Sequence, residues 1–321
     1  MAAMLEKKVA VVTGGGRGIG RAVALLLARE GARVVVADYG VNVDGTAPTS
    51  APAEDVVEEI CRLGGEALPA AHDVSTMQGG EAIIRTALDG FGRLDILVNV
   101  AGILRGRMIF NMNEEEWDAV IAVHLKGHFC TIKPASVLFR QQRSGRIINF
   151  TSAAGLAGNS GQANYGAAKA GIAGLTRVVA KDLGRYGVTC NCISPGAQTR
   201  MTKSVPQTAN ERRAAQGIGS AMGGRSTAAP SIDQMLPEQV APMVAYLASD
   251  EAGNINGQIF QCMGGQVALV ATPLPVRSIY TKGTWEPEEL AKLVPGQLMV
   301  DYVNPAPPLQ AQQQTQPASR T

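Results

Sequence analysis

Residues 9–20 read VAVVTGGGRGIG, and this stretch decides the fold class. Val9–Thr13 is short, apolar and rich in β-branched residues, which is typical of a buried strand. The glycines that follow allow a tight turn, and a helical pattern begins at Gly18. Such a turn lets the backbone approach a pyrophosphate, and the N–H groups that open the helix attract the phosphate charge. The stretch therefore predicts a dinucleotide-binding turn, to which we assign Gly14, Arg17, Gly18, Ile19 and Gly20.

Strand-like and helix-like segments alternate along the rest of the chain. The predicted strands are Val9–Thr13, Arg33–Asp38, Glu66–Ala71, Leu94–Val100, Arg146–Ser152, Val188–Ser194 and Gln258–Met263. The predicted helices are Gly18–Glu30, Ala53–Leu63, Met77–Phe91, Glu114–Gln141, Gln162–Arg185 and Pro237–Ser249. This repetition predicts an α/β fold of the Rossmann type, a doubly wound parallel sheet with helices on both faces.

Composition divides the chain into a single domain with a C-terminal extension. Residues 1–266 carry the alternating pattern and form the predicted dinucleotide-binding catalytic domain. Within them, Gln198–Leu236 has little apolar periodicity and is predicted to be a substrate lid. Residues 267–303 are an appendage with a helix predicted at Pro287–Leu293, where proline suits the first helical turn. Residues 304–321 are rich in proline and glutamine and are predicted to be disordered.

Charge and cysteine content narrow the class of partner. The net charge is +2 and no basic stripe with interleaved aromatic residues occurs, which argues against nucleic acid. Of the five cysteines, Cys190 and Cys192 form a C-x-C motif, but no second Cys or His pair lies at ligand spacing, so no metal site is predicted. No apolar run reaches the roughly 18 residues of a membrane span, and the N-terminus lacks a signal-peptide core. We expect a soluble cytoplasmic protein that acts on a small molecule.

Asp38 ends the second predicted strand, about 20 residues after the glycine-rich turn. A carboxylate at this point can accept hydrogen bonds from an adenosine ribose and repel a 2′-phosphate. Arg17 opposes this interpretation, because a guanidinium beside the turn could bind that phosphate. The position of Asp38 is set by the strand end, so we predict NAD as the cofactor.

A second motif, Tyr165-Gly-Ala-Ala-Lys169, lies within a predicted helix, so that its tyrosine and lysine share one face. A free tyrosine has a pKa near 10 and is a poor base, but a neighbouring ammonium favours the phenolate. Ser152, at the end of the fifth predicted strand, can donate a hydrogen bond to a substrate oxygen. Alone, a Y-x-x-x-K pattern is a common helix-surface pair. Together with a strand-end serine and a dinucleotide turn, it predicts Ser152, Tyr165 and Lys169 as catalytic residues.

These motifs together resemble the short-chain dehydrogenase/reductase family. The resemblance rests on the TGGGRGIG turn, NVAG at Asn99–Gly102, the serine, tyrosine and lysine, and SPGAQT at Ser194–Thr199, and it covers roughly residues 5–265. It implies a tyrosine general acid and base, a lysine that binds the nicotinamide ribose, and a homodimer or homotetramer. The cofactor residues that it implies are Asp73, Val74, Asn99, Ala101, Gly102, Tyr165, Lys169, Pro195, Gly196 and Thr199.

His124 departs from the wider family. Many members carry an asparagine in a V-N-L-K-G segment that completes a proton relay through water, whereas this chain reads VHLKG at Val123–Gly127. An imidazole can donate and accept, as an amide can, and it titrates near neutrality. We therefore predict a relay or structural role for His124 in the active site. A helix residue with no part in the chemistry remains the alternative.

Further segments resemble one subgroup of the family, the 3-hydroxyacyl-CoA dehydrogenase domain of the peroxisomal multifunctional enzyme of the second type and its bacterial stand-alone relatives. They include AGILR, VHLKG, GQANYGAAK and TRMT. The resemblance implies NAD-dependent oxidation of a 3-hydroxyacyl-CoA, or a steroid-derived equivalent, to the 3-ketoacyl-CoA. Two alternatives stay open: an NADPH-dependent ketoacyl or carbonyl reductase, and a non-catalytic dinucleotide-binding protein. Arg105 and Arg107 could bind CoA phosphates or be solvated loop charges.

Overall fold

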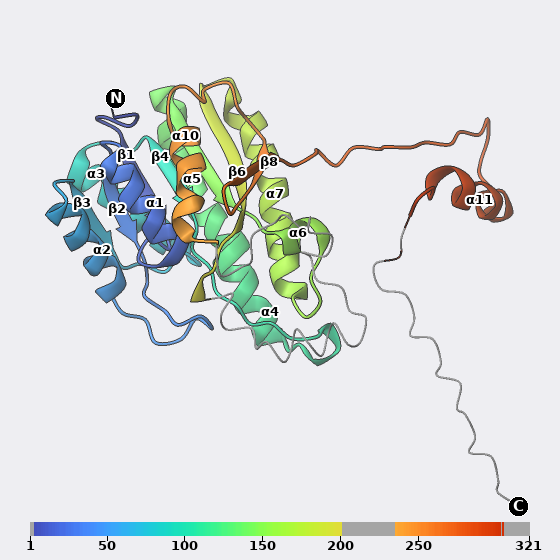
Figure 1. Cartoon of the computed structure of the whole chain (residues 1–321), viewed down its shortest axis with the longest axis horizontal. Helices are drawn as coiled ribbons and strands as arrows, with labels where there is room; N and C mark the ends of the chain where they lie inside the picture. The colour runs from blue at the N-terminus through green and yellow to red at the C-terminus, as the bar shows by residue number, and fades with distance from the viewer. Residues whose placement is uncertain (1–2, 201–234, 303, 305–321) are drawn as a thin grey trace, which may run out of the picture. The chain divides into compact units, whose positions relative to one another are not determined.

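The computed structural model describes residues 3–200, 235–302 and 304 (Figure 1). Residues 3–200 and 235–270 form one compact unit, and residues 271–302 and 304 belong to a second. Most of the predicted lid, Gln198–Leu236, and most of the predicted tail, 304–321, lie outside the described residues.

The first unit is built on an eight-stranded sheet with the order β3-β2-β1-β4-β5-β6-β7-β8. The strands are β1 Val9–Thr13, β2 Arg33–Ala37, β3 Ala67–Ala70, β4 Ile96–Asn99, β5 Gly145–Phe150, β6 Val188–Gly196, β7 Ile259–Met263 and β8 Gln266–Leu269. All neighbours pair in parallel except β7 and β8, which form an antiparallel pair. The prediction of a doubly wound parallel sheet is confirmed, and the sheet continues past residue 266 because β8 turns back along β7.

Helices cover both faces of this sheet. They are α1 Gly18–Arg29, α2 Ala51–Arg62, α3 Met77–Phe91, α4 Glu114–Ile121, α5 Gly127–Gln142, α6 Ala153–Ala157, α7 Ala163–Gly184 and α10 Ala241–Ala248. Helix α4 begins as the sequence predicts, because Asn113 and Glu116 form a reciprocal capping box. The short α6 was not predicted.

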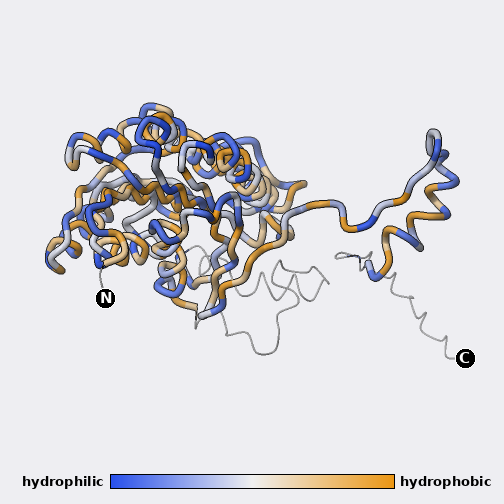
Figure 2. The backbone as a smooth tube through the Cα atoms, turned by 90° about the horizontal axis from the view of Figure 1, so that it is seen from above, coloured by the Kyte–Doolittle hydropathy of each residue, from blue (hydrophilic) through white to orange (hydrophobic). Residues whose placement is uncertain are grey.

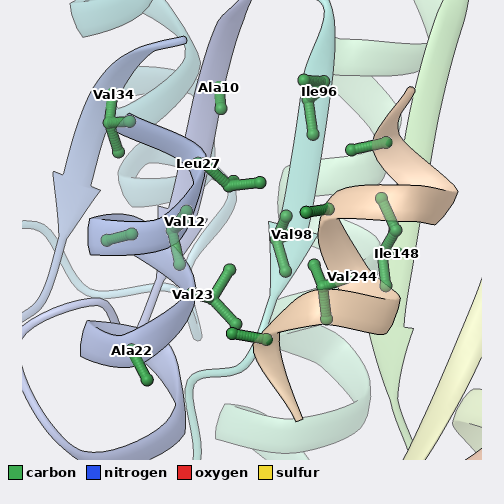
Figure 3. Close-up of a cluster of buried hydrophobic side chains, with 14 of the residues drawn as sticks. Ala10, Val12, Ala22, Val23, Leu27, Val34, Ile96, Val98, Ile148 and Val244 are labelled. Atoms are coloured by element: carbon green, nitrogen blue, oxygen red, sulfur yellow. The ribbon is translucent and has the colours of Figure 1, made fainter. Parts of the chain in front are cut away.

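Alternate strand residues divide the core into two layers. Val12, Ile96 and Val98 pack on one face against α1, α2 and α10, where Val23 and Val244 meet them (Figure 3). The residues between them, such as Val11 and Leu97, pack on the other face against α3, α5 and α7. Figure 2 shows the helical tubes changing between hydrophobic and hydrophilic colour along their length, as helices with one buried face must.

The order of the strands reverses between β1 and β4, and this reversal places the candidate site. The chain winds from β1 through β2 to β3 in one direction and from β4 through β5 to β6 in the other. Helices that follow β1 and β4 therefore lie on opposite faces, which leaves a crevice at the carboxyl ends of the strands. The glycine-rich turn, Asp38, Asp73 and Ser152 all follow strands at this edge.

The predicted helix Glu114–Gln141 is divided. A π-turn, Ala122–Lys126, separates α4 from α5 and contains His124. An extra residue in one turn changes the direction of the side chains that follow. Accordingly, α4 packs mainly against α7, and α5 packs mainly against α3.

The second unit contains a short helix, α11 Pro287–Leu293, as predicted, followed by a π-turn, Val294–Leu298. Glu286 and Glu289 form a capping box at its start. The guanidinium of Arg277 donates to the carbonyl oxygens of Leu298 and Val300. Among the described residues of both units, no helix is long and apolar enough to cross a membrane.

Candidate active site

The glycine-rich turn packs closely against the loop that follows β4. Gly14 has a φ of +66°, and a Cβ atom on it would lie 2.8 Å from the Cα of Ala101. A Cβ on Gly20 would collide with the carbonyl oxygen of Gly14. The hydroxyl of Thr13 accepts hydrogen bonds from the backbone N–H groups of Val100 (3.1 Å) and Ala101 (3.3 Å). Glycine is therefore required at positions 14 and 20 by the close approach of two backbone segments.

The start of α1 fits a dinucleotide pyrophosphate. Gly18, Ile19 and Gly20 line a cavity of about 470 Å³, and the side chain of the capping residue Arg17 forms no hydrogen bond with the helix end. The N–H groups of a first helical turn have no partners within the helix, and the helix dipole favours an anion beside them. These groups fit the anion site that the sequence predicts.

Asp38 lies at the nucleotide end of the same cavity. Its carboxylate accepts hydrogen bonds from the backbone N–H groups of Gly16 (2.9 Å) and Gly40 (2.7 Å). Arg17 donates to the carbonyl oxygen of Val41 (3.2 Å) and also lines the cavity. Each carboxylate oxygen has a second lone pair, so the group can still accept bonds from ribose hydroxyls.

Arg200 lies at the same end and was not singled out from the sequence. Burial and the charge of Arg17 lower the pKa of Arg200, and the carboxylate of Asp38 opposes that shift. One carboxylate and two guanidinium groups thus influence the charge at this end of the cavity.

Most of the predicted site residues line this single cavity. They are Gly14, Arg17, Gly18, Ile19, Gly20, Asp38, Asp73, Val74, Ala101, Gly102, His124, Ser152, Tyr165, Lys169, Pro195 and Thr199. The structure does not bring Asn99 and Gly196 into the lining. The side-chain amide of Asn99 donates to Asn149 on β5 (3.1 Å) and accepts from Thr131 on α5 (2.8 Å), so it is held between the sheet and that helix. A Cβ on Gly196 would lie 2.5 Å from the Cβ of Met263 on the next strand.

The sequence interpretation missed one wall of the cavity, formed by the loop after β2. Tyr39, Val41, Asn42, Val43 and Gly45 of this loop line the cavity. The unusual length of the polar stretch 40–52 was the signal that could have indicated a role. His72, directly before Asp73, is a further lining residue that was missed.

Ser152, Tyr165 and Lys169 come together at the carboxyl end of β5 and the start of α7. Ser152 caps α6, and its hydroxyl oxygen accepts from the N–H of Ala154 (3.2 Å). The ammonium of Lys169 donates to the carbonyl oxygen of Phe150 (2.7 Å) and lies 5.6 Å from the centre of the Tyr165 ring. The three side chains therefore share one end of the cavity, as their spacing predicts.

Burial sets the protonation of the tyrosine and the lysine. Desolvation raises the pKa of Tyr165, and a hydrogen bond from Ser152 opposes that rise. Desolvation also lowers the pKa of Lys169, to about 8. The chain's own residues do not bring the pKa of the phenol below its ordinary value. The Lys169 charge can stabilise the Tyr165 phenolate only while the ammonium remains protonated, which holds below about pH 8.

His124 is buried between the cofactor loop and the tyrosine. Its Nε2 lies 2.7 Å from the carbonyl oxygen of Ile103 and 3.1 Å from the Ile103 nitrogen. A Cβ on Gly102 would collide with the imidazole, so glycine is needed there. The rings of His124 and Tyr165 meet edge to face with their centres 5.1 Å apart. The imidazole thus contacts both the cavity-lining loop at Gly102 and Ile103 and the ring of Tyr165.

The expectation that His124 titrates near neutrality is corrected. Desolvation lowers its pKa well below the ordinary value, and the charge of Lys169 acts in the same direction. A second buried histidine, His128, has its pKa lowered to about 3, again mainly by desolvation. Its Nδ1 lies 2.6 Å from the carbonyl oxygen of His124, and because a carbonyl only accepts, this nitrogen donates. Both imidazoles are therefore neutral at physiological pH.

Arg105 and Arg107 are ion-paired in this structure. Arg105 contacts Glu115 (2.9 Å) and Arg107 contacts Glu116 (2.7 Å). Arg105 also donates to the backbone carbonyl of Asp44 (2.8 Å). Only Arg105 of the two lines the cavity. Any CoA phosphate at these arginines would have to compete with the two glutamates.

The described part of the chain contains no cluster of side chains suited to binding a metal ion. Among those residues, no group of three or more His, Cys, Asp or Glu side chains is placed to hold a metal ion.

Three curated relatives resemble the chain over most of its length. Hydroxyacyl-CoA dehydrogenase ChsB1 of Mycobacterium tuberculosis is 44% identical over 299 residues, which cover 89% of this chain and 87% of that protein. A 3-oxoacyl-[acyl-carrier-protein] reductase of Synechocystis is 44% identical over 82% of this chain and 98% of its own length. Peroxisomal multifunctional enzyme type 2 of Mus musculus is 38% identical over 82% of this chain and 32% of the larger mouse protein.

A solved structure and a family model agree with these relatives. The crystal structure of a short chain dehydrogenase from Mycobacterium avium superposes with a TM-score of 0.76 at 42% identity, covering 92% of this chain and 96% of that one. The family model described as short chain dehydrogenase matches residues 8–210, which contain the glycine-rich turn and the serine, tyrosine and lysine. The chain is a member of the short-chain dehydrogenase family.

Proposed function

We propose that the protein is an NAD-linked dehydrogenase that oxidises the secondary alcohol of a 3-hydroxyacyl-CoA to the 3-ketoacyl-CoA, with bulky or steroid-derived acyl chains among its substrates. The observation that carries the proposal is that Ser152, Tyr165 and Lys169 line the same cavity as the glycine-rich turn and Asp38. The acyl-CoA substrate class is supported by the similarity to the mycobacterial hydroxyacyl-CoA dehydrogenase. The intact catalytic set argues against a non-catalytic dinucleotide-binding protein.

The chemistry follows from the positions of these side chains. The turn at Gly14–Gly20 would hold NAD, with the adenosine ribose at Asp38. When bound, NAD would accept a hydride from the carbon that bears the substrate hydroxyl. With substrate bound, the Ser152 hydroxyl would turn its single proton from Tyr165 to the substrate oxygen and orient that oxygen by donating a hydrogen bond to it. In its deprotonated form, the phenolate oxygen of Tyr165 takes the proton of the substrate hydroxyl and becomes the phenol. The Lys169 ammonium, 5.6 Å from the tyrosine ring, favours the phenolate and so assists that transfer.

Tyr165→Phe should lower kcat by at least about 100-fold, because general acid–base catalysis supplies roughly 10²–10⁴. NAD affinity should persist, since the glycine-rich turn is untouched. The measurement is the absorbance of the reduced nucleotide with a panel of 3-hydroxyacyl-CoAs and hydroxysteroids. Tyr246→Phe, on α10, is the matched control and should retain wild-type turnover. Near-normal turnover in Tyr165→Phe would remove the phenol from the mechanism.

NAD rather than NADP is the proposed cofactor, because a 2′-phosphate beside the Asp38 carboxylate would be repelled. A like-charge juxtaposition costs several kcal/mol. Arg17 and Arg200 supply the opposite argument, and together with the Synechocystis reductase they support the second candidate, an NADPH-dependent ketoacyl reductase. The coenzyme preference therefore separates the two candidate functions.

Wild-type protein should show the higher kcat/KM with NAD, and Asp38→Ser should relax that preference by lowering the kcat/KM for NAD and raising that for NADP. Asp118→Ser, which removes an exposed carboxylate on α4, should leave the ratio unchanged. Both ratios are measured by steady-state kinetics with the two nucleotides. A wild-type preference for NADP would show that the arginines dominate and would favour the reductase.

For His124 we propose a role in the active site that does not depend on its titration. Its imidazole holds the backbone of Ile103 and contacts the ring of Tyr165, so it maintains the wall on which the catalytic tyrosine rests. A neutral imidazole also has one donor and one acceptor nitrogen, as the predicted relay would require.

His124→Ala should lower kcat more than it weakens NAD binding, and His124→Asn should restore part of the loss because an amide also donates and accepts. The pKa of His124 lies well below its ordinary value, so no step in the kcat profile between pH 6 and 8 should come from this residue. The profile of His124→Asn should therefore have the wild-type shape. Unchanged kcat in His124→Ala would place the histidine outside the mechanism.

A homodimer or homotetramer in the cytoplasm completes the proposal. Phe129 and Val137 on α5 and Val178 on α7 are large apolar side chains that are about half exposed, as a subunit interface built on these helices requires. All five cysteines are free thiols, which suits a reducing compartment.

Light scattering should give two or four times the chain mass of 33.5 kDa, and a monomer would contradict the proposed interface.

A further inference from the structure

Asn164, the residue directly before the catalytic tyrosine, is completely buried. Its side-chain amide nitrogen donates two hydrogen bonds, to the carbonyl oxygens of Arg105 (2.9 Å) and Glu116 (2.8 Å). Its side-chain oxygen accepts from the backbone N–H of Tyr165 (2.8 Å). Both donors of the amide are therefore used, and the acceptor is used as well.

The three partners of Asn164 belong to three separate parts of the unit. Arg105 lies in the extended segment after β4, Glu116 lies in the first turn of α4, and Tyr165 lies in the first turn of α7. The N–H groups of a first helical turn have no helical acceptor, and Gln162 provides no side-chain cap for α7. The Asn164 oxygen supplies the missing acceptor at the catalytic residue itself. This buried amide thus ties the start of α7 to α4 and to the segment at Arg105, alongside the backbone bridge between Arg107 and Gln162.

The segment that Asn164 binds also forms part of the cofactor site. The N–H of Leu104 donates to the carbonyl oxygen of Val43 (2.8 Å), and the Arg105 guanidinium donates to that of Asp44 (2.8 Å). Val43 lines the cavity. Leu104 and the Arg105 side chain therefore bind the loop after β2, which lines the cavity. The Arg105 carbonyl oxygen binds Asn164 at the start of α7.

We infer that Asn164 is a positioning residue that holds Tyr165 in line with Ser152 and the cofactor cavity by tying the start of α7 to Arg105 and α4. It acts through the backbone and does not itself touch the reacting atoms. The inference rests on the proposed dehydrogenase activity, because the benefit of the position appears in the hydride-transfer step. Displacement of a catalytic group by about 1 Å can cost about 100-fold in rate, so a brace one residue from the phenol has a large effect.

Asn164→Asp tests this inference with little change in shape. The aspartate replaces both N–H donors with an oxygen, which then faces two carbonyl oxygens in a buried place. We expect kcat to fall by at least about tenfold, while the dissociation constant for NAD, measured by calorimetry, is unchanged because the bonds to Val43 and Asp44 remain. Asn164→Ser keeps one donor and is the milder variant if Asn164→Asp does not fold. The kcat of Asn164→Ser should lie between those of wild type and Asn164→Asp.

Asn256, in the segment between α10 and β7, provides a matched control because its side chain also binds α7. Its amide donates to the carbonyl oxygen of Ala180 in the last part of α7 (3.0 Å) and accepts from the N–H of Cys190 on β6 (2.8 Å). Asn256→Asp removes a comparable bridge far from Tyr165 and should lower stability while leaving kcat at the wild-type level. An equal fall of kcat in both aspartate variants would show general destabilisation and overturn the inference.

Hydrogen–deuterium exchange gives a readout that does not need turnover. The N–H of Tyr165 is protected by the Asn164 oxygen, so exchange in a peptide covering residues 163–167 should be faster in Asn164→Ser than in wild type. Unchanged exchange together with unchanged kcat would overturn the inference. If wild-type protein oxidised no member of the substrate panel, the proposed function would fail, and the exchange result alone would decide whether Asn164 holds the start of α7.

Discussion

The close approach of the backbone at β1 and β4 is the constraint on which the rest of the site depends. Gly14 and Ala101 come so near to each other that a side chain at position 14 has no room, and the hydroxyl of Thr13 binds the two N–H groups of the β4 loop. These two strands are where the winding of the sheet reverses. The contact therefore fixes the width of the crevice in which a dinucleotide can lie, and every other lining residue is placed relative to it.

Polar groups beneath and around the crevice are arranged so that buried charge is limited. The two buried histidines are neutral, and Lys169 holds its proton only weakly. Neither imidazole therefore carries a positive charge near Lys169. The positive charge that acts on Tyr165 and on a bound nucleotide is that of the Lys169 ammonium. A low local dielectric strengthens that field and also makes any unpaired polar group costly. The amides of Asn99 and Asn164 avoid that cost, because each is engaged on both its donor and its acceptor side.

The sequence predicts the parts of the molecule that depend on short-range spacing. The glycine-rich turn, the strand-end position of Asp38 and the shared helix face of Tyr165 and Lys169 follow from neighbours along the chain. The environment of His124 does not, because its pKa depends on burial against Gly102 and on the charge of Lys169. The ion pairs of Arg105 and Arg107 also could not be predicted, since their partners come from a helix whose distance is set by tertiary packing. The length of stretch 40–52 was a signal for the cavity wall after β2, but which of its residues line the cavity depends on tertiary packing.

The π-turn at Ala122–Lys126 has a consequence for how this region can vary. One nearly continuous rod of helix buries two faces that point in different directions, α4 toward α7 and α5 toward α3. The extra residue in that turn rotates the apolar face of α5 about the helix axis relative to the apolar face of α4. Loss or gain of one residue there would realign the patterns and expose one of the two faces, whatever residue was involved. The length of the segment is thus constrained in addition to its composition, and the histidine occupies the point where the two patterns meet.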